Sequence, residues 1–114
     1  MSYKVGYRFE WRVKQTFAEK GFIVRRNPAS KPYDLDVIEN GRIKYLIECK
    51  TTSKDQLYVY GLKKIIETAK KFKAKPLLVY AFYYTPMYVK EIKKEGEKAF
   101  KNKKNILLEK YLGG

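Results

Sequence analysis

Residues 33–50 read YDLDVIENGRIKYLIECK, and this stretch decides the fold. Asn40-Gly41 is a dipeptide that strongly favours the tight turn between two antiparallel strands. Apolar and polar residues alternate on both sides of it, as they do in strands that bury one face. The stretch therefore predicts a β-hairpin whose strands occupy residues 33–38 and 42–50.

The second strand of this hairpin ends in a pair of opposite charges. Side chains alternate along a strand, so Ile47 and Cys49 are expected to face the core. Glu48 and Lys50 then share the other face. An acid and a lysine at the end of an otherwise apolar strand are costly to bury without partners. We infer that this face is either solvated or a functional site.

Hydrophobic spacing and turn residues predict the remaining elements. The apolar run at 77–82 is typical of a central strand covered on both faces, and the lysine-rich residues 93–105 receive no assignment. The order α-β-β-β-α-β-β predicts an α/β fold with a single mixed central β-sheet flanked by helices. The other expected elements are a helix at 4–20, a strand at 22–26, a helix at 58–72, a strand at 87–92 and a short helix at 106–112.

Length and charge bound the class of protein. The 114 residues suffice for one domain, residues 1–114. Because 45% of them are hydrophobic, we expect a folded domain that carries its charge on the surface. The 26 lysines and arginines exceed the 12 acidic residues by 14, an excess that attracts polyanions such as nucleic acid. We find no membrane-spanning run or signal peptide, and we expect a soluble, cytoplasmic protein with no membrane partner.

Two residue counts exclude whole classes of chemistry. The absence of histidine excludes His-based zinc sites and Ser-His-Asp triads, and the single cysteine, Cys49, cannot form an internal disulfide. Catalysis must therefore use carboxylates, lysine, hydroxyls or a bound hard metal ion.

Two aspartates compete for the position beside Glu48. Asp34 and Asp36 share one face of the first hairpin strand, and one of them lies diagonal to Glu48, at roughly 7–8 Å between Cα atoms. A three-residue loop at 39–41 with a glycine bulge selects Asp34, whereas a shift by one residue selects Asp36. The sequence leaves both open, and we favour Asp34.

The first helix offers a further carboxylate. Glu10 projects from it and reaches the hairpin if the helix packs alongside. Carboxylate oxygens at this spacing suit Mg²⁺, and Mn²⁺ as a substitute. Lys50 would orient or deprotonate an attacking water, or neutralise the charge that develops on a phosphate.

An aspartate, a spacer and then Glu48-Cys49-Lys50 is a pattern that resembles the PD-(D/E)XK nuclease superfamily. The fuller set of motifs is similar to the archaeal-type Holliday-junction resolvases. This resemblance covers roughly residues 4–83. The matching segments are Gly6 to Glu10, Gly21-Phe22, Arg26 to Ser30, Asp34-Leu35, Tyr45 to Lys50, Thr52, Lys54-Asp55, Leu57-Tyr58-Val59 and Phe72 to Leu77.

The resemblance implies a restriction-endonuclease-like fold and an Mg²⁺-dependent endodeoxyribonuclease that resolves four-way DNA junctions. Such enzymes act as homodimers and nick two opposed strands. In this family a loop serine, here Ser30, lies near the scissile phosphate. The family has one aspartate at a fixed distance from the E-x-K motif, and the two candidates here bracket that distance by one residue each way. The implied catalytic and metal-binding set is Glu10, Asp34 or Asp36, Glu48 and Lys50.

Basic and aromatic residues supply the remaining candidates. Arginine forks match phosphate oxygens, so basic residues that flank the site in sequence are candidates for DNA contacts. These are Arg8, Arg12, Arg25, Arg26, Lys31 and Lys54.

We interpret most tyrosines as core or dimer-interface residues, with Tyr45, Tyr58 and Tyr80 as the best examples, and expect Leu62, Ile66 and Phe72 in the core. A second E-x-K copy, Glu91-Ile92-Lys93, follows no aspartate-bearing hairpin strand and is interpreted as surface charge.

Two rival functions stay open. A PD-(D/E)XK nuclease of another specificity would cut linear duplex or branched ends as well as four-way junctions. A basic, non-catalytic nucleic-acid-binding protein would have carboxylates that diverge in space.

Overall fold

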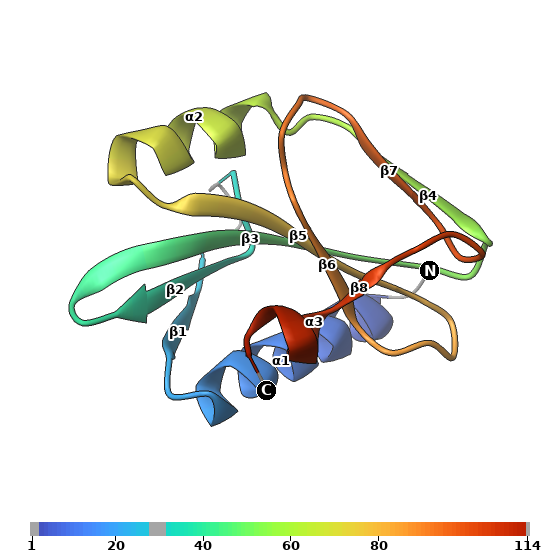
Figure 1. The fold of residues 1–114 in the computed structure, drawn as a ribbon, viewed down its shortest axis with the longest axis horizontal. Helices are drawn as coiled ribbons and strands as arrows, with labels where there is room; N and C mark the ends of the chain where they lie inside the picture. Colours follow the sequence, from blue (N-terminus) through green and yellow to red (C-terminus); the bar gives the residue numbers. More distant parts are fainter. Residues whose placement is uncertain (1–2, 28–31, 114) are drawn as a thin grey trace.

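The computed structural model describes residues 3–27 and 32–113. Three helices and eight strands are assigned in them (Figure 1). In chain order they are α1 (Tyr3–Glu19), β1 (Ile23–Arg26), β2 (Leu35–Glu39), β3 (Arg42–Thr52), β4 (Gln56–Val59), α2 (Lys63–Phe72), β5 (Lys75–Phe82), β6 (Tyr88–Glu91), β7 (Glu97–Phe100), β8 (Ile106–Leu107) and α3 (Leu108–Tyr111).

Six of the strands form one mixed sheet in the order β1-β2-β3-β5-β6-β8. The central pair, β3 and β5, is parallel, and the other neighbours are antiparallel. Strands β4 and β7 form a separate two-stranded sheet. The mixed central sheet with flanking helices confirms the expected α/β architecture.

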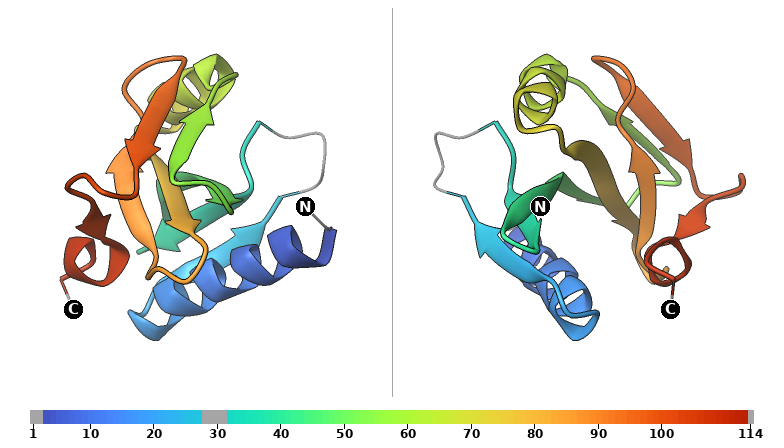
Figure 2. Two further views of the ribbon diagram at one scale, coloured as in Figure 1. Left: turned by 90° about the vertical axis from the view of Figure 1, so that its right-hand side faces the viewer. Right: turned by 60° about the vertical axis from the view of Figure 1, so that its left-hand side comes forward.

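Helices cover both faces of the large sheet (Figure 2). On one face α1 packs through Phe9, Val13 and Phe17, which recur every four residues and so form one buried stripe. On the other face lie α2 and the β4–β7 pair, with Ile65 and Ala69 of α2 in the second core. None of the helices in the described residues is long and apolar enough to cross a bilayer.

Strand β5 is the central strand expected from its apolar run. Leu77, Val79 and Ala81 belong to the core beneath α1. Leu78, Tyr80 and Phe82 alternate with them and belong to the core beneath α2. All six are buried, because both faces of this strand are covered.

The hairpin turn differs from the three-residue loop considered above. Asn40 and Gly41 alone form it, with φ of 55° and 75°, and Glu39 pairs with Arg42. The register then shifts between Val37 and Ile38, because a bulge leaves one extra residue on β3. As a result Leu35 pairs with Ile47, and Asp34 comes beside Glu48.

Two predicted helices begin later than expected, and the residues left unassigned contain a strand. The helix predicted at 58–72 begins only at Lys63, and β4 precedes it. Leu57 and Val59 are buried while Tyr58 is exposed, which is the alternation of a strand. The unassigned residues 93–105 contain β7, the partner of β4. The terminal helix predicted at 106–112 is shorter, because its first two residues form β8.

The core assignments are confirmed for some residues and corrected for others. Tyr45, Tyr80 and Leu62 are buried, as expected. Phe72, expected in the core, is 45% exposed, because it sits on the outer side of its helix. Tyr58, expected in the core or a dimer interface, is 46% exposed, which excludes the core only.

The same substitution at two glycines should have opposite effects on stability. Gly41→Ala places a side chain in the left-handed region and is expected to destabilise the fold by about 1–2 kcal/mol. Gly6 lies within α1 with open space around it, so Gly6→Ala is expected to stabilise by about 0.5–1 kcal/mol. Urea unfolding measures both, and equal effects of one sign would contradict the turn geometry.

Candidate active site

The candidate site lies where β2 and β3 part. The two strands pair as far as Leu35 and Ile47, and the N–H of Asp34 still donates to the carbonyl of Ile47 at 2.8 Å. Strand β3 continues alongside β5 as far as Thr52. Past Ile47, therefore, the β2-facing edge of β3 pairs with no strand of residues 3–27 and 32–113.

The carboxylate of Asp34 occupies this opening. Its Oδ2 accepts a hydrogen bond of 2.7 Å from the N–H of Cys49, the next group on that edge. The side chain thus takes the place of a strand partner and is held in a fixed orientation. Burial raises the pKa of Asp34, and the Cys49 hydrogen bond and Lys50 oppose the rise.

Glu48 is the most perturbed of the acids at the site. Its side chain is only 18% exposed, and its Oε2 lies 3.5 Å from Nζ of Lys50. Burial raises the pKa of Glu48 to about 7, the charge of Asp34 adds to the rise, and Lys50 opposes it. Glu48 is therefore a carboxyl that loses its proton near neutral pH.

Glu10 reaches the same region from α1. Its Oε1 accepts a hydrogen bond of 3.2 Å from Nε of Arg26. Burial raises the pKa of Glu10, the charge of Asp34 adds to the rise, and Arg26 opposes it. The charge of Glu10 also contributes to the raised pKa of Glu48. The structure therefore brings Glu10, Asp34 and Glu48 into one electrostatically coupled cluster, with Lys50 beside it.

Each carboxylate of this cluster has its own partner. Asp34 holds the backbone of Cys49, Glu10 pairs with Arg26, and Glu48 pairs with Lys50. Within residues 3–27 and 32–113, no group of three or more acidic or thiol side chains is arranged to hold a metal ion as it stands. An ion bound here would compete with Arg26 for Glu10 and with Lys50 for Glu48.

Asp36 is engaged elsewhere. It is buried, and Arg25 of the neighbouring strand donates to both of its carboxylate oxygens, at 2.9 and 3.3 Å. A forked pair of this kind fixes β1 against β2. Of the two candidate aspartates, Asp34 lies in the cluster and Asp36 pairs with Arg25.

The predicted DNA-contacting residues lie in different surroundings. Arg8 and Arg12 are exposed on α1, and Lys54 is exposed in the turn between β3 and β4. Arg26 contacts Glu10, and its guanidinium lies 5.0 Å from the centre of the Tyr7 ring. Two predicted residues, Ser30 and Lys31, lie outside the described residues.

The sequence reasoning did not single out Tyr7 and Trp11. Both are about half exposed, and together with Glu10, Lys14 and Arg26 they line a small hollow of about 50 Å³. The signal for them was their spacing, because residues four apart lie on one side of a helix.

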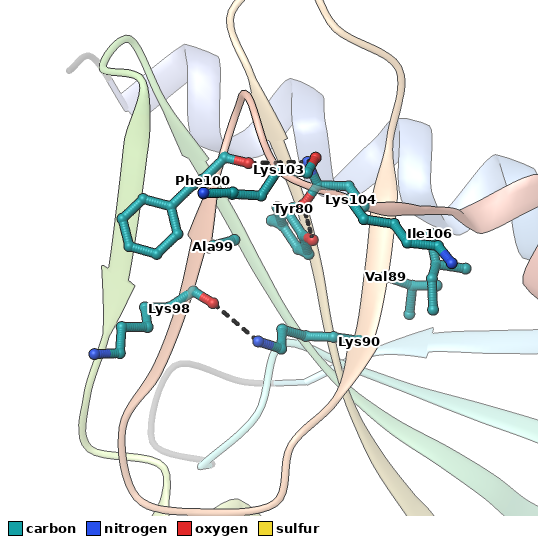
Figure 3. Close-up of a pocket in the computed structure, with 10 residues that line it drawn as sticks. Tyr80, Val89, Lys90, Lys98, Ala99, Phe100, Lys103, Lys104 and Ile106 are labelled. Atoms are coloured by element: carbon teal, nitrogen blue, oxygen red, sulfur yellow. Dashed lines mark hydrogen bonds between the residues drawn. The ribbon is translucent and has the colours of Figure 1, made fainter.

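A second hollow, of about 230 Å³, is rich in lysine (Figure 3). Lys90, Lys98, Lys103 and Lys104 line it together with Tyr80, whose hydroxyl donates to Asn105 at 2.6 Å. No carboxylate lines this hollow. It therefore lacks the acidic groups that the candidate active site provides.

Comparisons with known proteins match between 70% and nearly all of the chain. The family model described as "Archaeal holliday junction resolvase (hjc)" matches residues 1–112. The chain is 34% identical to the crossover junction endodeoxyribonuclease Hjc of Methanocaldococcus jannaschii over 82 residues, which are 70% of this chain and 61% of that relative. The fold is similar to that of Archaeoglobus fulgidus Hjc, with a TM-score of 0.78, 15% identity and 95% of each chain covered. The chain therefore belongs to the archaeal Holliday junction resolvase family.

Proposed function

We propose that this protein is a metal-dependent endodeoxyribonuclease that resolves four-way DNA junctions by paired symmetric nicks. The observation that carries the proposal is the coupled cluster of Glu10, Asp34 and Glu48 beside Lys50, at the place where β2 and β3 part. The matched relative is named a crossover junction endodeoxyribonuclease, and the similar structure is described as a Holliday junction resolvase, which supports this substrate.

The donor set of the site fits Mg²⁺. Three coupled carboxylates with raised pKa values repel one another, and a divalent cation relieves this repulsion. Their hard oxygens suit Mg²⁺ or Mn²⁺, and the single thiol close by, on Cys49, has a pKa that burial raises well above its ordinary value. A bound Mg²⁺ would activate a water and neutralise charge on the scissile phosphate. Asp34, Glu48 and Glu10 would hold it.

The protein's own groups have separate roles in this proposal. Asp34 is held in place by the Cys49 N–H, so little ordering of its side chain is needed. Glu48 and Glu10 would hold the cation, in competition with their present partners Lys50 and Arg26. Lys50, which is about half exposed, would orient the attacking water or bind a phosphate oxygen.

Charge and stoichiometry support a branched DNA substrate bound by a homodimer. The net charge of +14 favours binding to the phosphate backbone, which is the part of four-way DNA that presents its shape. Two simultaneous nicks need two sites, and the described residues gather one carboxylate cluster of this kind, so a second copy of the chain would supply the other. A DNA substrate is consistent with the cytoplasmic location expected from the sequence.

A nuclease of another specificity is the closest alternative. A panel of four-way junctions, flaps and linear duplexes of equal length separates the two functions. We expect cleavage of the four-way junction at paired symmetric positions. Equal cutting of linear duplex would favour a restriction-like enzyme, and binding without cutting would favour a non-catalytic binder.

The two residues at the end of β3 should be required for cleavage and dispensable for binding. We expect Glu48→Gln or Lys50→Ala to lower the cleavage rate at least about 100-fold. Junction affinity should stay close to wild type, because the large positive charge barely changes. The second E-x-K copy provides the matched control, since Glu91→Gln and Lys93→Ala should leave both properties unchanged. Loss of binding in parallel with cutting would indicate a structural role instead.

Divalent cations should separate binding from turnover. We expect Mg²⁺ or Mn²⁺ to support cleavage, and Ca²⁺ to support junction binding without cutting, because its larger and more flexible coordination suits the reaction less well. The measurement is gel analysis of a labelled synthetic junction with each ion. Full activity in EDTA would overturn the metal-dependent mechanism.

Glu48 should make the fold less stable at high pH. Its pKa is about 7 in the folded protein against an ordinary value of 4.5, so folding takes up a proton between these values and stability falls as pH rises through them. Glu48→Gln removes this loss. We expect the variant to be more stable than wild type at pH 8, by at most about 3 kcal/mol.

Thermal unfolding in the presence of a chelator, at pH 5 and at pH 8, tests this expectation. Glu67, exposed on α2, provides the control, and Glu67→Gln should leave the pH dependence unchanged. A Glu48→Gln variant that is less stable than wild type at pH 8 would contradict the electrostatic description of the site.

A further inference from the structure

A groove of about 820 Å³ lies between α1 and the turn that joins β5 to β6. Arg8 and Arg12 line it from the helix, and Tyr83 and Tyr84 line it from the turn. Thr51, the residue after Lys50 on β3, also lines it. The groove therefore borders the two elements that carry Glu10 and Lys50, although neither of those residues lines it.

The two arginines are spaced so that both can contact one strand of DNA. They lie four residues apart on α1, which is about 6 Å along the helix axis and on one side of it. Both are exposed. Glu10 lies two residues from each of them, about half a turn around the same helix. The arginines therefore lie on the far side of α1 from Glu10, and DNA bound in the groove would cross the helix to reach the carboxylate cluster.

Tyr84 is presented to solvent by a well-ordered turn. The Thr85 hydroxyl accepts from the N–H of Phe82 at 3.0 Å and donates to the carbonyl of the same residue at 2.9 Å. At the tip, Tyr84 is completely exposed and has a φ of 67°, a region that non-glycine residues rarely adopt. Its ring meets that of Tyr83 edge to face. Folding gains little from this side chain, and at a basic groove its ring is available to a ligand.

We propose that Tyr84 stacks on an unstacked base at the branch point of a DNA junction, while Arg8 and Arg12 bind phosphates of the same strand. Aromatic side chains beside a basic groove are the usual way in which proteins hold unpaired bases. In a four-way junction held open, the base pairs at the branch point stack on one side only and so expose a face. This inference rests on the proposed function and assigns a recognition role to a turn outside the carboxylate cluster.

The test compares variants of Tyr84 in a junction-binding assay with Ca²⁺. Tyr84→Ala is expected to weaken binding to the four-way junction about tenfold, with little change on linear duplex of equal length. Tyr84→Phe keeps the ring and should restore wild-type affinity. Tyr84→Gly suits the positive φ, so it guards against loss of folding and should bind like the alanine variant.

Two further measurements locate the contact. A fluorescent adenine analogue at the branch point should be quenched by wild type and by Tyr84→Phe, and not by Tyr84→Ala. The double variant Arg8→Ala/Arg12→Ala should weaken binding to junction and duplex alike and lower the salt dependence by about two phosphate contacts. Tyr60→Ala, at another exposed tyrosine, should change nothing.

The outcomes distinguish this inference from the proposed function. A wild-type protein that neither binds nor cuts the junction contradicts the proposed function, and the inference falls with it. A wild-type protein that cuts the junction, together with a Tyr84→Ala variant of unchanged affinity and quenching, overturns the inference alone. Equal losses on junction and duplex in Tyr84→Ala would also overturn it, because stacking at a branch point requires a difference between them.

Discussion

The hydrogen bond from the Cys49 N–H to Asp34 is the contact on which the site depends. Two strands that part inside a protein leave unpaired backbone groups, and a buried N–H without a partner is costly. Here the carboxylate of Asp34 accepts the hydrogen bond of the N–H. The same contact therefore allows the two strands to separate and fixes an acidic group at the place where they do. Glu48 precedes Cys49 on the same strand, and Lys50 follows it.

This arrangement of carboxyl groups lowers the stability of the folded protein in exchange for a reactive site. Three carboxyl groups share a partly buried region, and burial raises the pKa of each because it disfavours the charged form. The charge of Asp34 adds to the rise at Glu10 and Glu48. The ion pairs of Glu10 with Arg26 and of Glu48 with Lys50 offset only part of this cost. The pair between Arg25 and Asp36 shows the contrast, since it lies one strand away with good geometry and joins β1 to β2.

The sequence predicted what depends on local pattern. The hairpin, the apolar strand β5 and the acid and lysine at the end of β3 follow from alternation and turn chemistry, and the structure has them all. It could not decide between Asp34 and Asp36, because the choice depends on a bulge that no turn residue announces. Strand β4 was missed for a similar reason: it is four residues long, and its partner β7 lies almost forty residues further along the chain.

Helix α1 contributes to the core, to the carboxylate cluster and to the groove, each from a different side. Phe9, Val13 and Phe17 bury one stripe against the sheet. Glu10 leaves that stripe on one flank and meets Asp34 and Arg26, while the exposed arginines leave it on the other flank and line the groove. The buried stripe fixes the rotation of the helix, so the packing of three apolar side chains determines where both the carboxylate and the arginines lie. In so small a protein, the core that stabilises the fold also positions the residues of the site and of the groove.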